Sequence, residues 1–280
     1  MCNRYFCFFA IIMVGFFISS CSSTSLMARD MMTTKVAEDH GFTKKEVSGG
    51  LFNLTTFQKI TEIKKPYIFY IEGDGYAFDP NTQRITSNPT PRNMMMLRLA
   101  IRDKRPNVTY IARPCQFTPI HTQGNCHEIY WSDKRMSEEV VESINEVINK
   151  ISSHKHPIDL VGFSGGGGIA VLVAERNKNV KSIVTIGGNL DHVSFNKYHN
   201  VRPMIGSLNP IDYATKINTM PQMHFAGGKD KVVPPFIAQD FVSASKNNKC
   251  VKSLINNNAS HVNGWEEYFQ KNAIEAPICR

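Results

Sequence analysis

Residues 157–177 read PIDLVGFSGGGGIAVLVAERN. A short apolar run with strand character, residues 158–161, leads into Ser164, which has a glycine two positions before it and another two positions after it. An apolar segment with helix character follows. This order of strand, sharp turn and helix is the context in which a Gly-x-Ser-x-Gly motif presents a nucleophile. The small neighbours allow the strained backbone of such a turn to close.

Two other glycine-rich motifs do not fit this segment. A phosphate-binding loop needs Lys and then Ser or Thr after its last glycine, but Ile169 and Ala170 stand there. A dinucleotide-binding turn needs G-x-G-x-x-G, but the residue two after Gly162 is Ser164. The alternative that remains is a glycine-rich turn with an incidental serine, so the nucleophile interpretation depends on partners elsewhere in the chain.

Length and composition indicate one large α/β domain behind a leader. The chain has 280 residues, and its hydrophobic fraction of 42% is that of a globular protein rather than of a disordered one. The net charge is +8, but the basic residues are scattered and form no stripe interleaved with aromatic residues. We therefore expect no nucleic-acid partner.

The first twenty residues predict a lipoprotein signal peptide. Residues 5–18 are almost wholly apolar, a run too short to span a bilayer comfortably. The sequence Ile18-Ser19-Ser20-Cys21 resembles the lipobox of bacterial lipoproteins, which implies that residues 1–20 are removed and that Cys21 carries the lipid. An ordinary secretory signal and an uncleaved anchor are the alternatives. Residues 21–44 would then form a tether in the bacterial cell envelope, on an outer membrane and facing the periplasm or the exterior.

Four cysteines lie beyond the leader: Cys115, Cys126, Cys250 and Cys279. An even number is consistent with pairing in an oxidising compartment. The close spacing of the first two suggests a bridge that closes a local loop, which would leave Cys250 with Cys279. Four cysteines allow three connectivities, and buried free thiols are a further alternative.

Strand and helix patterns alternate along residues 45–280, which predicts one α/β domain with a mainly parallel central sheet and helices on both faces. The predicted strands are a hairpin within 46–60 and residues 67–71, 107–112, 158–161, 180–186, 222–226 and 250–255. The predicted helices cover 94–101, 136–152, 169–175, 234–244 and 264–272. Residues 187–221 look irregular, and an insertion of this length is often a lid or substrate-binding element.

Reactive groups in an open parallel sheet collect beyond the carboxyl ends of its strands. Here these loops carry Ser164, Asp230 and His261, in that order, together with the loop at residues 73–75. The order Ser, Asp, His is the one found in α/β-hydrolases. The joint pattern is far more specific than the serine turn alone.

The chain resembles the α/β-hydrolase superfamily over roughly residues 45–275, and more closely bacterial lipoprotein hydrolases without an assigned substrate. The segments that carry this resemblance are YIEGDGYAF, PTPRN, ARPCQF, residues 126–131, GFSGGG, GNLDH, SLNP and GGKDKVVPP. It implies an α/β-hydrolase fold and a serine hydrolase, with no cofactor.

The resemblance also assigns roles. Ser164 would be the nucleophile, His261 its general base and then its general acid, and Asp230 the group that orients the imidazole. The oxyanion would be held by the backbone N–H groups of Gly165 and Asp74, with Gly75 in reserve. Relatives have a His-Gly pair at the end of the earlier strand, whereas this chain has Glu72-Gly73.

Several alternatives stay open at this point. Asp191 and His192 follow a predicted strand and could compete for the roles of acid and base, as could His199. Tyr130 and Trp131 could line the pocket or simply pack beneath the loop. A metal site is not expected, because the spacing of its candidate ligands matches no zinc pattern. Those candidates are His121, Cys126, His127 and Glu128.

The sequence thus predicts a membrane-tethered serine hydrolase acting on a small-molecule or lipid acyl substrate. Carboxylic ester hydrolysis through an acyl-serine intermediate is the leading activity. A peptidase, an amidase or an acyltransferase could use the same residues. A non-catalytic envelope protein that keeps the fold as a binding module belongs to a different class. No feature of the sequence specifies an oligomeric state.

Overall fold

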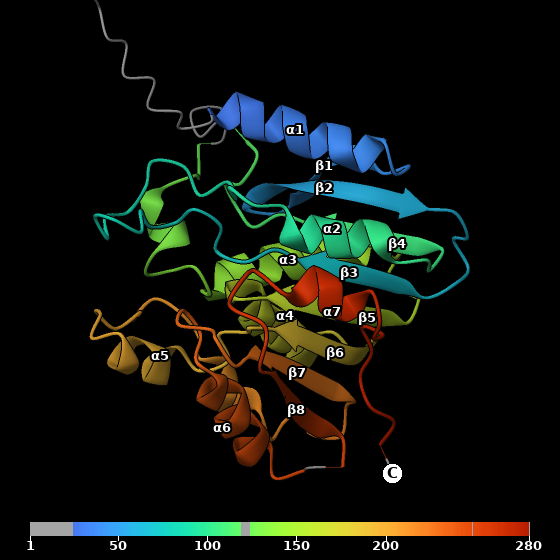
Figure 1. Ribbon diagram of the computed structural model, residues 1–280. Coiled ribbons are helices and arrows are strands. Elements are labelled where there is room, and N and C mark those ends of the chain that lie inside the picture. Colours follow the sequence, from blue (N-terminus) through green and yellow to red (C-terminus); the bar gives the residue numbers. More distant parts are fainter. Residues whose placement is uncertain (1–24, 119–123, 248, 280) are drawn as a thin grey trace, which may run out of the picture.

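The computed structural model describes residues 25–118, 124–247 and 249–279. The predicted signal peptide, Cys21 and His121 lie outside these residues. In the described part, an eight-stranded sheet runs through the molecule in the order β1-β2-β4-β3-β5-β6-β7-β8 (Figure 1). Among the helices of that part, none is both long and apolar enough to cross a membrane.

The sheet is mainly parallel, as predicted. The hairpin of β1 (Thr43–Gly49) and β2 (Phe52–Ile60) is antiparallel and forms one edge, and β2 runs antiparallel to its other neighbour, β4. The remaining strand pairs are parallel. Those strands are β3 (Tyr67–Ile71), β4 (Asn107–Ile111), β5 (Ile158–Phe163), β6 (Val180–Ile186), β7 (Gln222–Gly227) and β8 (Val251–Asn256).

Helices cover both faces of the sheet (Figure 1), and each face has its own apolar core. One core includes residues of α3 (Glu138–Ile151), α4 (Gly165–Arg176) and α6 (Pro235–Ser245). The other includes residues of α1 (Leu26–Glu38), α2 (Met95–Arg102) and α7 (Trp265–Phe269). Every residue of β3 and β4 is buried, which explains why β3 is a continuous apolar and aromatic run rather than an alternating one.

The segment expected to be a tether differs from the prediction. Residues 26–38 form α1, whose N-terminus is capped by the Ser25 side chain and whose Ala37 is fully buried. An ion pair of 2.5 Å between Lys44 and Asp30 fixes the helix to β1. The sequence hides these contacts, because the apolar residues of α1 have almost no amphipathic periodicity. The helix is part of the domain, so only residues before Leu26 remain for a tether.

The insertion at 187–221 is less irregular than expected. It contains α5 (His192–Tyr198) and the 3₁₀ turn η3 (Pro210–Tyr213). Asp191 caps α5 by accepting hydrogen bonds from the N–H groups of Val193 and Ser194. A seven-residue helix is too short to show a repeat in the sequence, although its cap residue is visible there.

Two disulfides are present. Cys115 is bonded to Cys126, and Cys250 is bonded to Cys279. The first closes the loop between β4 and the 3₁₀ turn η2 (Glu128–Trp131), and the second joins the start of β8 to the C-terminal segment. Cys126 is therefore a disulfide partner and not a free metal ligand. Within the described residues no group of three or more His, Cys, Asp or Glu side chains could hold a metal ion.

Candidate active site

Ser164 occupies a strained turn between β5 and α4. Its φ of 51° and ψ of −121° lie outside the regions that ordinary residues prefer. The glycines on either side make this turn possible. A β-carbon on Gly162 would collide with the backbone of Gly166, and one on Gly166 would collide with the carbonyl oxygens of Ile71 and Glu72. The glycine pattern therefore reflects close packing of the turn against β3.

The structure brings Ser164, His261 and Asp230 together. The Ser164 Oγ lies 3.1 Å from His261 Nε2, and His261 Nδ1 lies 2.8 Å from Asp230 Oδ2. A carboxylate can only accept a hydrogen bond, so Nδ1 carries the proton and Nε2 faces the serine as an acceptor. This tautomer is the one in which an imidazole can take a proton from a serine hydroxyl.

Each partner of Ser164 is held by its own loop. Asp230 follows β7 and is buried, and its Oδ1 accepts hydrogen bonds of 2.8 Å from the N–H groups of Val232 and Val233. His261 follows β8, and its ring packs 4.8 Å from the ring of Phe163, centroid to centroid. The Asp230 carboxylate thus has a fixed direction, with Oδ2 left for the imidazole.

Two backbone N–H groups beside Ser164 are candidates to bind an oxyanion. Among the described residues, the N–H groups of Asp74 and Gly165 have no hydrogen-bond acceptor. Gly165 directly follows the serine. Gly73 lies against the serine on the other side, since a β-carbon on it would be 3.1 Å from Ser164 Cβ. This arrangement leaves unpaired donors next to the hydroxyl, as an oxyanion hole requires.

The side chain of Asp74 is neutralised by two buried arginines. Its Oδ1 accepts a hydrogen bond of 3.2 Å from Arg113 Nη1, and its Oδ2 lies 3.4 Å from Arg135 Nε, an ion-pair distance without hydrogen-bond geometry. Arg113 also donates to the backbone carbonyl of Arg135. The acidic residue therefore does not place an uncompensated negative charge beside Ser164.

Glu72 stands where the resemblance implied a histidine. Its side chain is buried, and its two oxygens accept hydrogen bonds of 2.8 Å from the N–H of Gly73 and the hydroxyl of Tyr110. Burial raises the pKa of Glu72 to about 7, against the opposing effect of these two hydrogen bonds. Glu72 is thus a well-packed anchor for the first residue of the 73–75 loop.

The competing acid and base candidates have other roles. Asp191 is the cap of α5 and also accepts a hydrogen bond from Asn209, 2.9 Å away. Burial alone would raise the pKa of Asp191, but these hydrogen bonds outweigh it and lower the pKa. His199 Nε2 lies 2.7 Å from the backbone carbonyl of Val232. His192 is buried, and desolvation lowers its pKa. None of the three contacts Ser164 or His261 through a hydrogen bond in the described structure.

Tyr130 and Trp131, the aromatic pair of η2, pack against other residues rather than line an open pocket. Trp131 is buried and its Nε1 donates a hydrogen bond of 3.0 Å to the carbonyl of Thr86. The ring of Tyr130 contacts that of Phe52 edge to face, with centroids 4.8 Å apart. These contacts agree with the interpretation of the pair as packing beneath the loop.

The comparison with protein families decides the identity at the family level. Residues 94–262 match the family described as serine hydrolase (FSH1). The chain belongs to this family. The matched region contains Ser164, Asp230 and His261, and it begins after the 73–75 loop. A search of curated proteins finds no match to the sequence of this serine hydrolase.

Solved structures with the same fold include hydrolases of several kinds. An acylaminoacyl peptidase from Pyrococcus horikoshii is 15% identical with a TM-score of 0.57; the match covers 84% of this chain but only 42% of that one. The esterase Pf2001 from Pyrococcus furiosus is 15% identical with a TM-score of 0.57, over 84% of this chain and 90% of that one. Est1E from Butyrivibrio proteoclasticus is 14% identical with a TM-score of 0.54, over 82% and 95%.

At such low identity these likenesses show the fold alone, and the fold is that of the α/β-hydrolases. This serine hydrolase spans less than half of the length of the acylaminoacyl peptidase and nearly all of the length of the two smaller proteins. The predicted fold class and the resemblance to the superfamily are both confirmed.

The sequence did not predict three residues that contact Gly73 or Asp74: Arg113, Gln116 and Arg135. Arg113 follows β4 by two residues, so it lies beyond the carboxyl end of a parallel strand, and this position was a usable signal. Gln116 comes shortly after it. Arg135 is one of the scattered basic residues of the sequence, and it is buried. Nothing in its local sequence distinguishes it from a solvated arginine.

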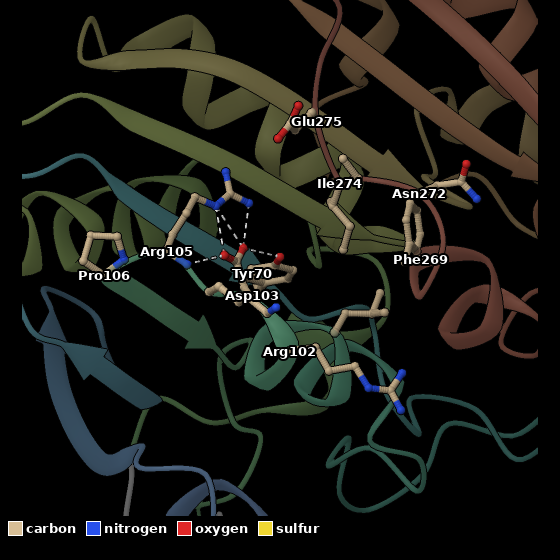
Figure 2. Close-up of a pocket in the computed structure, with 12 residues that line it drawn as sticks. Tyr70, Arg102, Asp103, Arg105, Pro106, Phe269, Asn272, Ile274 and Glu275 are labelled. Carbon is tan, nitrogen blue, oxygen red and sulfur yellow. Dashed lines mark hydrogen bonds and ion pairs between the residues drawn. The ribbon is translucent and has the colours of Figure 1, made fainter.

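A cavity of about 610 Å³ is lined by residues other than Ser164, Asp230 and His261 (Figure 2). It is lined by Tyr70, by residues 102–106 at the end of α2, and by the C-terminal segment. Its lining residue Pro106 directly precedes β4, whereas Ser164 follows the carboxyl end of β5. Its central polar groups are already paired, because Tyr70 and Arg105 both donate hydrogen bonds to Asp103 (Figure 2).

Proposed function

We propose that this serine hydrolase cleaves carboxylic esters, with Ser164 as nucleophile, His261 as general base and acid, and Asp230 as the group that orients the imidazole. The observation that carries the proposal is the continuous hydrogen-bonded chain from Ser164 Oγ through the His261 ring to Asp230. The strained Ser164 backbone and the unpaired N–H groups beside it support the same assignment.

The reaction would proceed in two acyl transfers. Ser164 Oγ attacks the ester carbonyl carbon while its proton passes to His261 Nε2, and the carbonyl electron pair moves to the oxygen. The N–H groups of Asp74 and Gly165 would stabilise that oxyanion. Collapse expels the alcohol, which takes the proton from His261. Water then attacks the acyl carbon while its proton passes to His261. Collapse breaks the bond to Ser164 Oγ, which takes that proton back from His261, and the carboxylic acid dissociates.

Labelling with a fluorophosphonate probe tests the nucleophile. The folded wild-type protein should react at Ser164, and Ser164→Ala should neither react nor hydrolyse p-nitrophenyl esters, with a loss of several orders of magnitude in turnover. Absence of labelling in folded wild type would favour a binding module. A panel of ester, anilide and peptide substrates separates an esterase from an amidase or peptidase.

We also propose that the enzyme is lipid-anchored in a bacterial envelope through Cys21, with residues 1–20 removed. The support is the lipobox-like sequence and the even number of cysteines beyond it. The domain that begins at α1 would then follow the anchor after only a few residues. Cys21→Ser should move the protein from the membrane fraction to the soluble fraction, and an unchanged distribution would refute lipidation.

A further inference from the structure

Gln116 is a buried glutamine whose amide is bound at both ends. It follows Cys115 on the loop after β4 and is 1% exposed. Its Oε1 accepts a hydrogen bond of 3.0 Å from the N–H of Arg113, and its Nε2 donates one of 3.0 Å to the carbonyl of Gly73. An N–H at one end and a carbonyl at the other fix the orientation of the amide.

The carbonyl of Gly73 and the N–H of Asp74 belong to one peptide group. A peptide is planar and almost always trans, so its C=O and N–H point in opposite directions. No peptide of the described chain is cis. The hydrogen bond from Gln116 to the carbonyl therefore also sets the direction of the Asp74 N–H.

We propose that Gln116 is a positioning residue for the oxyanion hole, acting through the Gly73–Asp74 peptide. This inference rests on the proposed function of Ser164. Gln116 itself is separated from the reacting atoms by that peptide, and its contribution is to keep the Asp74 N–H aimed beside Ser164. Gly73 has no side chain that would restrict the torsion angle on its side of this peptide, so the contact with Gln116 supplies that restraint.

Arg113 links the Gln116 contact to a second contact, which restrains the side chain of Asp74. Its backbone N–H binds Gln116, while its side chain donates to the Asp74 carboxylate. Asp74 is thus held through its peptide by Gln116 and through its side chain by Arg113 and Arg135. Both contacts come from buried groups, which limits the movement of the loop at the moment when charge develops.

A donor that acts on the oxyanion stabilises the transition state more than the ground state, so its loss lowers kcat rather than raising KM. Removing such a donor outright costs about 10²- to 10³-fold in kcat. A variant of Gln116 misdirects the donor without deleting it, and we expect a loss of about 10- to 100-fold.

Gln116→Glu is the sharpest test. As a carboxylate, the glutamate keeps the size of the side chain and the acceptor for the Arg113 N–H, but it places an oxygen without a proton against the Gly73 carbonyl. If the glutamate variant does not fold, Gln116→Met tests the same hydrogen bond, because methionine has a similar size and no donor. The readouts are kcat and KM on a p-nitrophenyl ester, the inhibition constant of a trifluoromethyl ketone, and the melting temperature.

Gln222 provides a matched control. It is also a fully buried glutamine, and its Nε2 donates a hydrogen bond of 2.7 Å to the carbonyl of Ile217. It stands at the amino end of β7, away from Ser164. Gln222→Met should lower the melting temperature without lowering kcat, whereas the Gln116 variants should lower kcat and weaken the ketone inhibitor by similar factors with KM little changed.

The outcomes separate this inference from the proposed function. If wild type has no ester hydrolase activity, or if Ser164→Ala keeps it, the proposed function fails. If Ser164→Ala is inactive and the Gln116 variants keep wild-type kcat, the positioning role of Gln116 is overturned. The role is also overturned if kcat falls in the Gln116 and Gln222 variants alike, because the effect would then follow from stability.

Discussion

The carboxylate of Asp74 occupies the space that a β-carbon on Gly165 would need. Gly165 is not among the glycines with positive φ, so its backbone conformation is open to any residue. The three atoms nearest to that β-carbon all belong to the Asp74 carboxylate, which its two arginines hold in place. The residue after Ser164 is therefore coupled to the middle residue of the 73–75 loop.

This contact makes Gly165→Ala a test of the site's packing. The added methyl group must displace Asp74 or Ser164, and a displacement of about 1 Å in an active site can cost 10²-fold in kcat/KM. Asp74→Ala should reduce activity by itself, because it leaves the buried Arg113 unpaired. In the double variant the alanine at 165 should cost far less than it does in wild type, with a coupling free energy of about 2 kcal/mol.

Gly166→Ala is the control for that cycle. Its β-carbon would meet the carbonyl oxygens of Ile71 and Glu72, which belong to the backbone and which no side-chain substitution removes. It should be equally damaging with Asp74 or Ala at position 74. Strictly additive effects of Gly165→Ala and Asp74→Ala would show that the two residues do not share space in solution.

The sequence predicted some of the residues around Ser164 but not those that hold Asp74. The order of Ser164, Asp230 and His261 and their positions after strands were visible, because apolar runs mark strands and parallel strands end at one edge. The fold followed from the same pattern and was confirmed. Arg113, Gln116 and Arg135 could not be recognised in the sequence as a group around Asp74. Their proximity comes from tertiary contacts with the 73–75 loop. Helix α1 was missed for a related reason, since its few buried residues form no periodic stripe.

Glu72 should make folding stability depend on pH. Its pKa is about 7 in the folded protein because of burial, against an ordinary value of 4.5. Between these values the folded state holds a proton that the unfolded state has lost. This contribution is therefore full below pH 4.5 and is lost as the pH rises to about 7, a change on the order of 3 kcal/mol. Glu72→Gln should remove this slope in urea unfolding, and a variant that keeps it would contradict the assignment.

His224 should make folding stability depend on pH in the opposite direction, so that stability is lost in acid. It is fully buried against the ring of Phe241, with its Nδ1 2.9 Å from the Thr185 hydroxyl, and burial lowers its pKa to about 3 from an ordinary 6.5. Between these values the unfolded state binds the extra proton, so stability is full above pH 6.5 and is lost as the pH falls toward 3. His224→Gln, which carries no titrating group, should unfold less steeply in acid than wild type, as followed by circular dichroism. An acid unfolding curve that is identical in the two proteins would exclude His224 as a source of acid sensitivity.

The two disulfides should differ in their effect on catalysis. Cys115 directly precedes Gln116, so its bond to Cys126 restrains the loop that holds the Gly73 carbonyl, whereas Cys250 joins the amino end of β8 to the C-terminal segment. Cross-links that span 11 and 29 residues stabilise a fold by about 3 and about 3.6 kcal/mol in the chain-entropy model. Replacing either pair with serine should therefore lower the midpoint of urea unfolding to a similar degree. Only Cys115→Ser with Cys126→Ser should also lower kcat on p-nitrophenyl esters, measured at a temperature where both variants are fully folded. Equal kcat values in the two variants would show that the first bridge stabilises the fold without contributing to the geometry of the oxyanion loop.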